Sequence, residues 1–407
     1  MNLKVLSVGS GIALLASICT VLFATTSLAS DESDLIKIRE LNQCINCDLR
    51  KANLANADLS GSQLSGADLR ESDLHNANLS GAILNYAKLR KANLSYALLD
   101  ASNLRETDMR NAILIGANLR LADLRDSDLS KADLSHSNLA RASLIGAKLR
   151  GSVLTSANLG KADFREADLS SAQLSGANMA KINLRRSYLS GADLTKAHLT
   201  EAVLSRADLS DATLLSANLN QASLREAFLS GADLTNADLQ SADLVGADLT
   251  NAVLINSNLT RAAVTGGILA GADLSGANLS KADLAGSNLS GANLTNSSLF
   301  ACNLAHADLS GANFHNADLS EANLRAVNLV RADLSGTDLT NAVLRKAVLT
   351  GANFTNAKLT GIDWSGADLT DVDLSGSELT AYDVARSILC GTQLPWGEEN
   401  RNCPKSP

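Results

Sequence analysis

Every fifth residue from Leu49 to Leu394 is apolar, and this spacing is kept without a shift over the whole stretch. Of these 70 positions, which we call centres, 62 are Leu. The other eight are Met109, Phe164, Met179, Val264, Phe314, Phe354, Trp364 and Val384. The residue two places before a centre is small, usually Ala, as in Ala232-Asp233-Leu234. The constant spacing predicts an array over residues 47–394 in which no loop is inserted.

A period of five matches neither the 3.6-residue period of a helix nor the 2.0-residue period of a strand. A helix would spread these leucines around its whole surface and leave most of them in water. A backbone that turns a corner every five residues avoids this, because the centre and the small residue point inward and three polar positions remain outside. The pairs that follow the centres, such as Ser-Gly and Thr-Asn, suit a turn, because Gly and Asn tolerate positive φ.

Tandem copies of Ala-Asp/Asn-Leu-x-x, as in ADLSGANLSKADL at residues 272–284, resemble the pentapeptide-repeat family over about 345 of the 407 residues. The resemblance implies an all-β solenoid, a right-handed quadrilateral β-helix with four pentapeptides per coil. The array would then form about 17 coils, and a strand spacing of ~4.8 Å gives a rod roughly 80 Å long. Some members of this family mimic DNA and bind type II topoisomerases.

The composition limits the width of the core. The chain is 45% hydrophobic but only 3% aromatic, so Leu and Ala supply nearly all of the apolar volume. A bore filled in this way has no room for a substrate. Five larger residues stand where a small one is expected, and there we expect local widening of the bore near an end rather than a ligand pocket: Ile182, Val327, Ile362, Val372 and Tyr382.

Residues 1–29 are interpreted as a targeting segment. Lys4 precedes an apolar run from Val5 to Leu28, and the small residues of Ser27-Leu28-Ala29 offer a cleavage point. This order is typical of a signal peptide, so we expect export to a periplasm or a thylakoid lumen. The alternative is an uncleaved membrane anchor over residues 5–29, because the run is long enough to cross a bilayer.

Both ends of the array are expected to carry caps, because an open solenoid end exposes unpaired strand edges. Residues 30–46 place Leu35, Ile38 and Leu41 on one helical face, with Ser33 as the N-cap, and therefore predict a short amphipathic capping helix. The C-terminal flank departs from the repeat. Both flanks resemble those of exported cyanobacterial pentapeptide-repeat proteins.

Five cysteines remain once the targeting segment is removed. In an oxidising compartment, Cys390 and Cys403 are expected to form a disulfide that staples the tail, residues 395–407. Cys44 and Cys47 fit either a local disulfide or a redox pair, although the βαβ setting of a redox pair is absent. A zinc site needs four ligands, and no further Cys or His lies nearby in the sequence.

No arrangement of side chains in the sequence predicts catalysis, a metal or a cofactor. With 20 residues per coil, the histidines lie far apart, and even His75 and His315, which share a vertical line, are 12 coils apart. Asp precedes many centres because the repeat contains it, and such solvated carboxylates lack the apolar pocket that raises a pKa. Cys302 takes an inward position and is expected to be an inert buried thiol. We therefore expect no enzymatic activity.

The exterior carries two arginine ladders, because residues 20 apart stack on one face. The first ladder contains Arg50, Arg70, Arg90, Arg110 and Arg150, and the second, on the preceding face, contains Arg105, Arg125, Arg165, Arg185 and Arg225. Residues 48–230 carry 22 basic and 20 acidic groups and residues 231–389 carry 8 and 17, so the rod is electrically polarised. Acidic residues follow several arginines and can pair with them: Glu71, Glu106, Asp126, Glu166 and Glu226.

These features favour a non-enzymatic scaffold in an exported compartment that binds a protein or an anionic surface through its outer faces. In the alternative interpretation of the ladders, they are merely a solvated surface. A DNA mimic that inhibits a type II topoisomerase is a second function, but it needs a dense acidic surface and residence in the cytosol. A third is ice binding through the stacked Thr340, Thr360 and Thr380.

Overall fold

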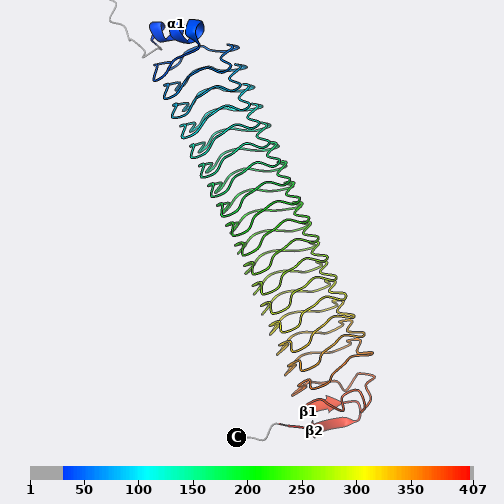
Figure 1. Cartoon of the computed structure of the whole chain (residues 1–407). Helices are drawn as coiled ribbons and strands as arrows, with labels where there is room; N and C mark the ends of the chain where they lie inside the picture. The colour runs from blue at the N-terminus through cyan, green and yellow to red at the C-terminus, as the bar shows by residue number, and fades with distance from the viewer. Residues whose placement is uncertain (1–30, 404–407) are drawn as a thin grey trace, which may run out of the picture.

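The computed structural model describes residues 31–403, which form one long rod with a helix at one end and two strands at the other (Figure 1). The elements in chain order are helix α1 (Glu32–Leu41), strand β1 (Leu389–Leu394) and strand β2 (Gly397–Arg401). Between α1 and β1 the chain winds as a stack of coils joined by single parallel bridges. The predicted targeting segment, residues 1–29, lies outside the described residues.

Backbone hydrogen bonds that repeat every 20 residues hold the coils together. The parallel bridges begin between Gln43 and Gln63, always join residues 20 apart, and involve the residue that precedes a centre. The N–H of each centre donates to a carbonyl in the next coil, as Leu234 does to Val253 at 2.7 Å. Four pentapeptides therefore complete one coil, and each coil supplies the hydrogen-bond partners of its neighbours.

Each corner of the coil is a β-turn that begins at a centre. The N–H of Ala237 donates to the carbonyl of Leu234 at 3.0 Å, and the same bond recurs along the array. The second residue after the centre has a positive φ, between 53° and 73°, at every corner from Asn46 to Asp371. This geometry is that of a type II turn and explains the Gly and Asn of the repeat. Many corners nevertheless carry a larger residue, and the stacking must outweigh the backbone strain there.

The centres and the small residues before them fill the interior. The Leu centres of the regular coils are buried, and the larger centres Phe164 and Phe314 are buried with them. Among the five residues that replace a small one, three lie inside the bore and Ile362 is half-buried, but Tyr382 is 89% exposed. The expectation of a widened bore is therefore wrong for Tyr382, because the chain has left the coil at that residue.

Helix α1 covers the first coil with one apolar face. Ile38 is buried and Leu35 packs against the core, whereas Leu41 is 65% exposed and does not belong to this face. The N-cap is Asp31, whose Oδ1 accepts the N–H of Ser33 at 2.8 Å. The predicted N-cap at Ser33 is therefore wrong, because the helix begins earlier and the Asp31 carboxylate reaches its first turn. No helix within residues 31–403 is both long enough and apolar enough to cross a membrane.

Asp34 joins helix α1 to the first coil. One carboxylate oxygen of Asp34 accepts the ammonium of Lys37 at 2.6 Å, and the other accepts the N–H of Asp48 at 2.9 Å. These bonds lower the pKa of Asp34, the Lys37 bond most and the Asp48 bond next. The helix is thus tied to the array by a charged hydrogen bond as well as by Ile38.

The last coil leaves the regular path between residues 375 and 387. No parallel bridge joins Lys358 or Asp363 to a residue 20 places further on, although the bridges resume between Asp368 and Ile388. The prediction of an uninterrupted array is therefore wrong for this coil, even though no residue is inserted. Size is the physical reason, because Tyr382 stands at an inward position that accommodates Ala elsewhere and would overfill the bore.

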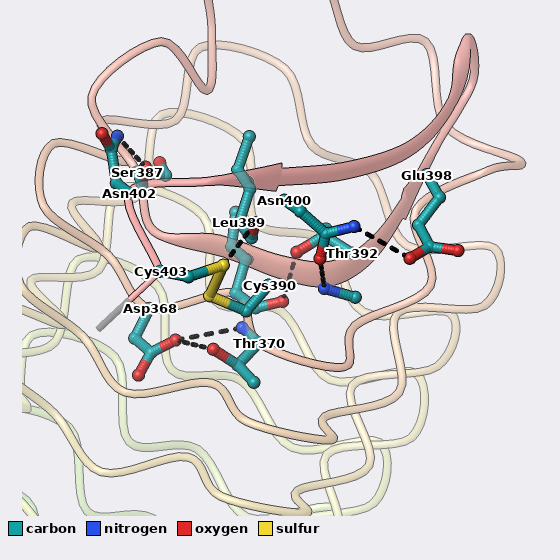
Figure 2. The surroundings of a disulfide bond; sticks show 12 residues. Asp368, Thr370, Ser387, Leu389, Cys390, Thr392, Glu398, Asn400, Asn402 and Cys403 are labelled. Carbon is teal, nitrogen blue, oxygen red and sulfur yellow. Dashed lines mark hydrogen bonds between the residues drawn. A yellow bond between two sulfur atoms is a disulfide. The ribbon is translucent and has the colours of Figure 1, made fainter. Parts of the chain in front are cut away.

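The C-terminal tail closes the rod as a β-hairpin. β1 pairs antiparallel with β2, and Leu389 and Leu394 of β1 are buried against the last coil. Cys390 and Cys403 are joined in a disulfide beside the hairpin (Figure 2). The Oδ1 of Asn400 accepts the N–H of Gly391 at 2.8 Å, which adds a bond between the strands. The sequence predicted a stapled tail but not these two strands.

We expect Leu234→Ala to lower the free energy of unfolding by about 2–5 kcal/mol, because the substitution leaves a cavity in a close-packed bore. Leu98→Ala is the matched control, because Leu98 is 44% exposed and lies directly before a centre. The control should change stability by less than about 0.5 kcal/mol. Urea unfolding followed by circular dichroism measures both, and equal losses for the two variants would contradict a core made of centres.

We expect Leu121→Gly to raise the free energy of unfolding by about 1 kcal/mol, because it relieves a strained backbone. Leu121 is 46% exposed and has a φ of 61°, so little packing is lost with its side chain. Gly61→Ala is the reverse experiment, since an added Cβ would meet nothing within 4 Å. The same urea midpoints should move in opposite directions, and a lower stability of Leu121→Gly would show that packing outweighs strain at the corners.

Candidate functional site

The first arginine ladder is largely neutralised by aspartates of the same face. Arg50, Arg70 and Arg110 each form an ion pair with the Asp two residues earlier, with N–O distances of 2.5, 2.5 and 2.6 Å. Arg90 and Arg150 differ, because Lys88 and Lys148 stand where the others have Asp. No carboxylate among the described residues lies within 4 Å of these two arginines. The ladder is thus three paired arginines and two exposed basic pairs.

The second ladder contains the same two kinds of arginine. Arg125 and Arg165 pair with the Asp two residues earlier at 2.5 and 2.7 Å, and Arg225 pairs with Asp243 at 3.0 Å. Asn takes the place of Asp before Arg105 and Arg185, so these two have no ion pair within residues 31–403. The identity of the residue before the centre therefore decides whether a ladder arginine is free.

The acidic residues that directly follow ladder arginines do not pair with those arginines, contrary to the sequence prediction. Glu71 lies 3.8 Å from Lys51, Glu166 lies 4.0 Å from Arg186, and Glu226 lies 2.7 Å from Arg206. The reason is the backbone, because these acidic residues stand at corners with positive φ, where side chains point away from the flat face. The partners of Glu71, Glu166 and Glu226 are corner residues of adjacent coils.

The ion pairs lower the pKa of the aspartates that they contain. Hydrogen bonds from Arg125 hold the pKa of Asp123 below its usual range, although desolvation by partial burial acts in the opposite direction. Arg110 lowers the pKa of Asp108 in the same way. A carboxylate whose pKa is lowered stabilises the fold above its unfolded pKa of about 3.9, and this contribution is lost as the pH falls through the lowered value.

The Asp and Asn residues before the centres stabilise the coil. The Oδ1 of Asp208 accepts the N–H of Ser210 at 3.0 Å, and many other corners contain this two-residue bond. Asn side chains also join neighbouring coils, as in the chain of 3.1 Å amide bonds through Asn118, Asn138, Asn158 and Asn178. The carboxylates and amides of this position therefore have a structural role, as local side-chain bonds to the backbone usually do.

Candidate metal ligands come together at one place within residues 31–403, at Asp34, Cys44 and Cys47. The two sulfurs are joined in a disulfide, and both oxygens of Asp34 are engaged by Lys37 and by the backbone. The described histidines do not meet one another. Burial raises the pKa of the Cys302 thiol, which keeps this free cysteine protonated. These groups therefore form no open metal or nucleophilic site.

The coil geometry defines a class of protein, the β-solenoid built from four pentapeptides per turn. Models of pentapeptide repeats match residues 47–85, 87–126, 117–155, 149–186, 187–225, 214–251 and 257–296, and a model of a pentapeptide repeat region matches residues 307–383. The chain belongs to the pentapeptide-repeat family. The right-handed β-helix solenoid that the resemblance implied follows from this membership.

Solved structures of other pentapeptide-repeat proteins are similar to this chain. HetL of Nostoc sp. strain PCC 7120, involved in heterocyst differentiation regulation, is 33% identical over 65% of this chain and 88% of its own, with a TM-score of 0.26. Rfr23 of the cyanobacterium Cyanothece 51142 is 41% identical over 23% and 58%, with a TM-score of 0.16. A thylakoid-lumen protein of Arabidopsis thaliana is 30% identical over 33% and 68%, with a TM-score of 0.12. No curated protein matches the chain in sequence.

We expect Arg125→Gln to lower the urea midpoint at pH 7 and low salt, because it removes the ion pair that keeps Asp123 ionised. The difference from the unmodified protein should shrink as the pH falls through the lowered pKa of Asp123. Arg185→Gln is the matched control on the same ladder, because Asn183 precedes it and offers no charge. A difference for Arg125→Gln that stays constant between pH 7 and pH 3 would exclude the ion pair as its cause.

Proposed function

We propose that the chain is a non-enzymatic scaffold that binds an acidic partner protein through its outer faces in an exported compartment. The family supplies the solenoid, which we take to comprise about 17 coils capped by α1 and by the β1–β2 hairpin. The inward positions of this solenoid hold the coils together, so recognition falls to the outward positions. A single observation supports the partner's chemistry, namely the unpaired cations of the first ladder.

Lys88 and Arg90 form one basic pair, and Lys148 and Arg150 form the other. All four side chains are exposed, and none has a carboxylate within 4 Å among the described residues. At a strand spacing of ~4.8 Å per coil, the two pairs lie three coils or about 14 Å apart on one face. Unpaired guanidinium and ammonium groups at fixed spacing favour a partner that presents carboxylates at a matching spacing.

The two other functions have less support. A DNA mimic would use the acidic half, residues 231–389, yet the N-terminal half carries the exposed basic pairs and the leader favours export. Ice binding needed Thr340, Thr360 and Thr380 in one column, but the N–H and Oγ1 of Thr380 bond to Asp383 in the segment that leaves the coil. The threonine column is therefore shorter than predicted, and ice binding is not proposed.

The proposed location is a periplasm or a thylakoid lumen. The apolar leader in residues 5–28 supports export, and the disulfides Cys44–Cys47 and Cys390–Cys403 suit an oxidising compartment. An uncleaved anchor would place the same rod on a membrane surface. Cell fractionation with a mass measurement of the mature chain distinguishes these locations, and finding the protein in the cytosol would restore the DNA-mimic alternative.

The binding proposal is tested by charge reversal at the four unpaired cations, Lys88, Arg90, Lys148 and Arg150, each to Glu. Crosslinking pull-downs from the exported fraction should lose the partner of the unmodified chain, and that loss should be greatest at low salt, where charge interactions are strongest. Binding to anionic vesicles and to an acidic glycan is measured in parallel. Stronger retention of either than of a protein would change the class of partner.

The matched control replaces Arg50, Arg70 and Arg110 with Gln. These arginines lie on the same ladder but are already paired with aspartates, so their loss should leave partner capture nearly unchanged. Equal effects of the two sets would show that only the overall charge matters. Unchanged capture with both sets would show that the ladder serves solubility alone.

A further inference from the structure

One outer face contains a cavity of about 520 Å³ in the middle of the rod. Its wall includes Tyr188 and Phe228, and Asp208 lies between them along the same column of stacked residues. Both rings are about half exposed, at 54% and 52%, which is unusual on a surface otherwise made of short polar side chains. The remaining wall includes Ser210 and a second carboxylate, Asp248.

The spacing of the coils sets the width of this cavity. Residues 20 apart are joined by parallel bridges, so Tyr188, Asp208 and Phe228 occupy three successive coils. The two aromatic residues therefore originate about 9.5 Å apart, at ~4.8 Å per coil. A group held midway would lie about 5 Å from each ring, inside the range of about 6 Å over which a cation is attracted to a ring face.

The charges of the cavity favour a cation. Asp208 and Asp248 have no ion-pair partner within 4 Å among residues 31–403. The arginines of the wall are already occupied, since Arg206 is 2.7 Å from Glu226 and Arg186 is 4.0 Å from Glu166. After these pairs are formed, the two carboxylates of the cavity remain uncompensated.

We propose that Tyr188, Asp208 and Phe228 form a binding site for an organic ammonium group. The two rings contact the cation from either side along the column, and the Asp208 carboxylate neutralises its charge from the coil between them. Ser210 offers a hydroxyl to a polar group attached to the ammonium. The ligand is either a small amine or the ε-ammonium of a lysine on a partner, because both present the same charge to the cavity.

The site shares its face with the basic pairs but differs from them in chemistry. Lys148 belongs to the same column and lies two coils before Tyr188, so the face changes from cationic to aromatic and acidic within a short length. An anionic partner at the basic pairs and a cationic group at this cavity do not compete. This site therefore does not depend on the proposed scaffold function.

The test uses the whole mature chain and four probes: choline, its neutral isostere 3,3-dimethylbutan-1-ol, N-acetyl-lysine methylamide and methyl glucoside. Saturation-transfer NMR and calorimetry measure their binding up to the millimolar range. We expect at least one of the two ammonium probes to bind about fivefold or more tightly than the neutral isostere, because the charge supplies the attraction. A preference for choline indicates a small amine, and a preference for the lysine derivative indicates a protein.

Three variants locate the binding. Tyr188→Ala, Phe228→Ala and Asp208→Asn should each weaken binding of the preferred ammonium probe by about fivefold. Asp208→Asn keeps an oxygen for the N–H of Ser210, so the turn is preserved.

Two controls on the same column should leave binding unchanged. Ile268→Ala removes a side chain that is 42% exposed, and Asp168→Asn changes a carboxylate that accepts the N–H of Ser170 just as Asp208 accepts that of Ser210. Equal binding of the neutral isostere, preferential binding of the glucoside, no binding of either ammonium probe, or equal losses in the controls would each overturn the proposal.

Discussion

The bond from each centre to the next coil is the interaction on which the whole rod depends. No coil can bury its leucines or pair its bridging amides alone, so every coil owes both packing and hydrogen bonds to its neighbours. This dependence tolerates residues such as Leu121 at corners with positive φ, where the local backbone is strained. It also makes the ends special, because α1 and the β1–β2 hairpin cover coils that have a neighbour on one side only (Figure 1).

Most of the fold could be predicted from the sequence because one spacing governs both the core and the corners. The predictions failed where a single side chain overrides that spacing. Tyr382 stands at an inward position of the array, yet it cannot enter the bore, and the last coil departs from the regular path around it. The N-cap was placed at Ser33 rather than Asp31 because both residues can cap a helix, and only the three-dimensional position of the first turn decides between them.

The outer faces were only partly predictable. The alignment of the arginines followed from the 20-residue coil, but their pairing depends on which residue two places earlier shares the flat face. Asp at that position neutralises Arg50, whereas Lys at that position leaves Arg90 exposed. The cavity between Tyr188 and Phe228 was missed, although the two residues are separated by 40 positions and hence belong to one column. Reading apolar residues every 20 positions would have revealed it.

The closed 20-residue turn also governs how this chain can change in length. Gain or loss of 20 residues adds or removes one full layer and leaves every remaining column in line, so a surface assembled from several columns survives. Gain or loss of five residues keeps the bore intact but rotates one part of the rod against the other by a quarter turn. Lineages of such rods can therefore keep their stability under either event, whereas a recognition surface that extends across the joint is inherited only in whole layers.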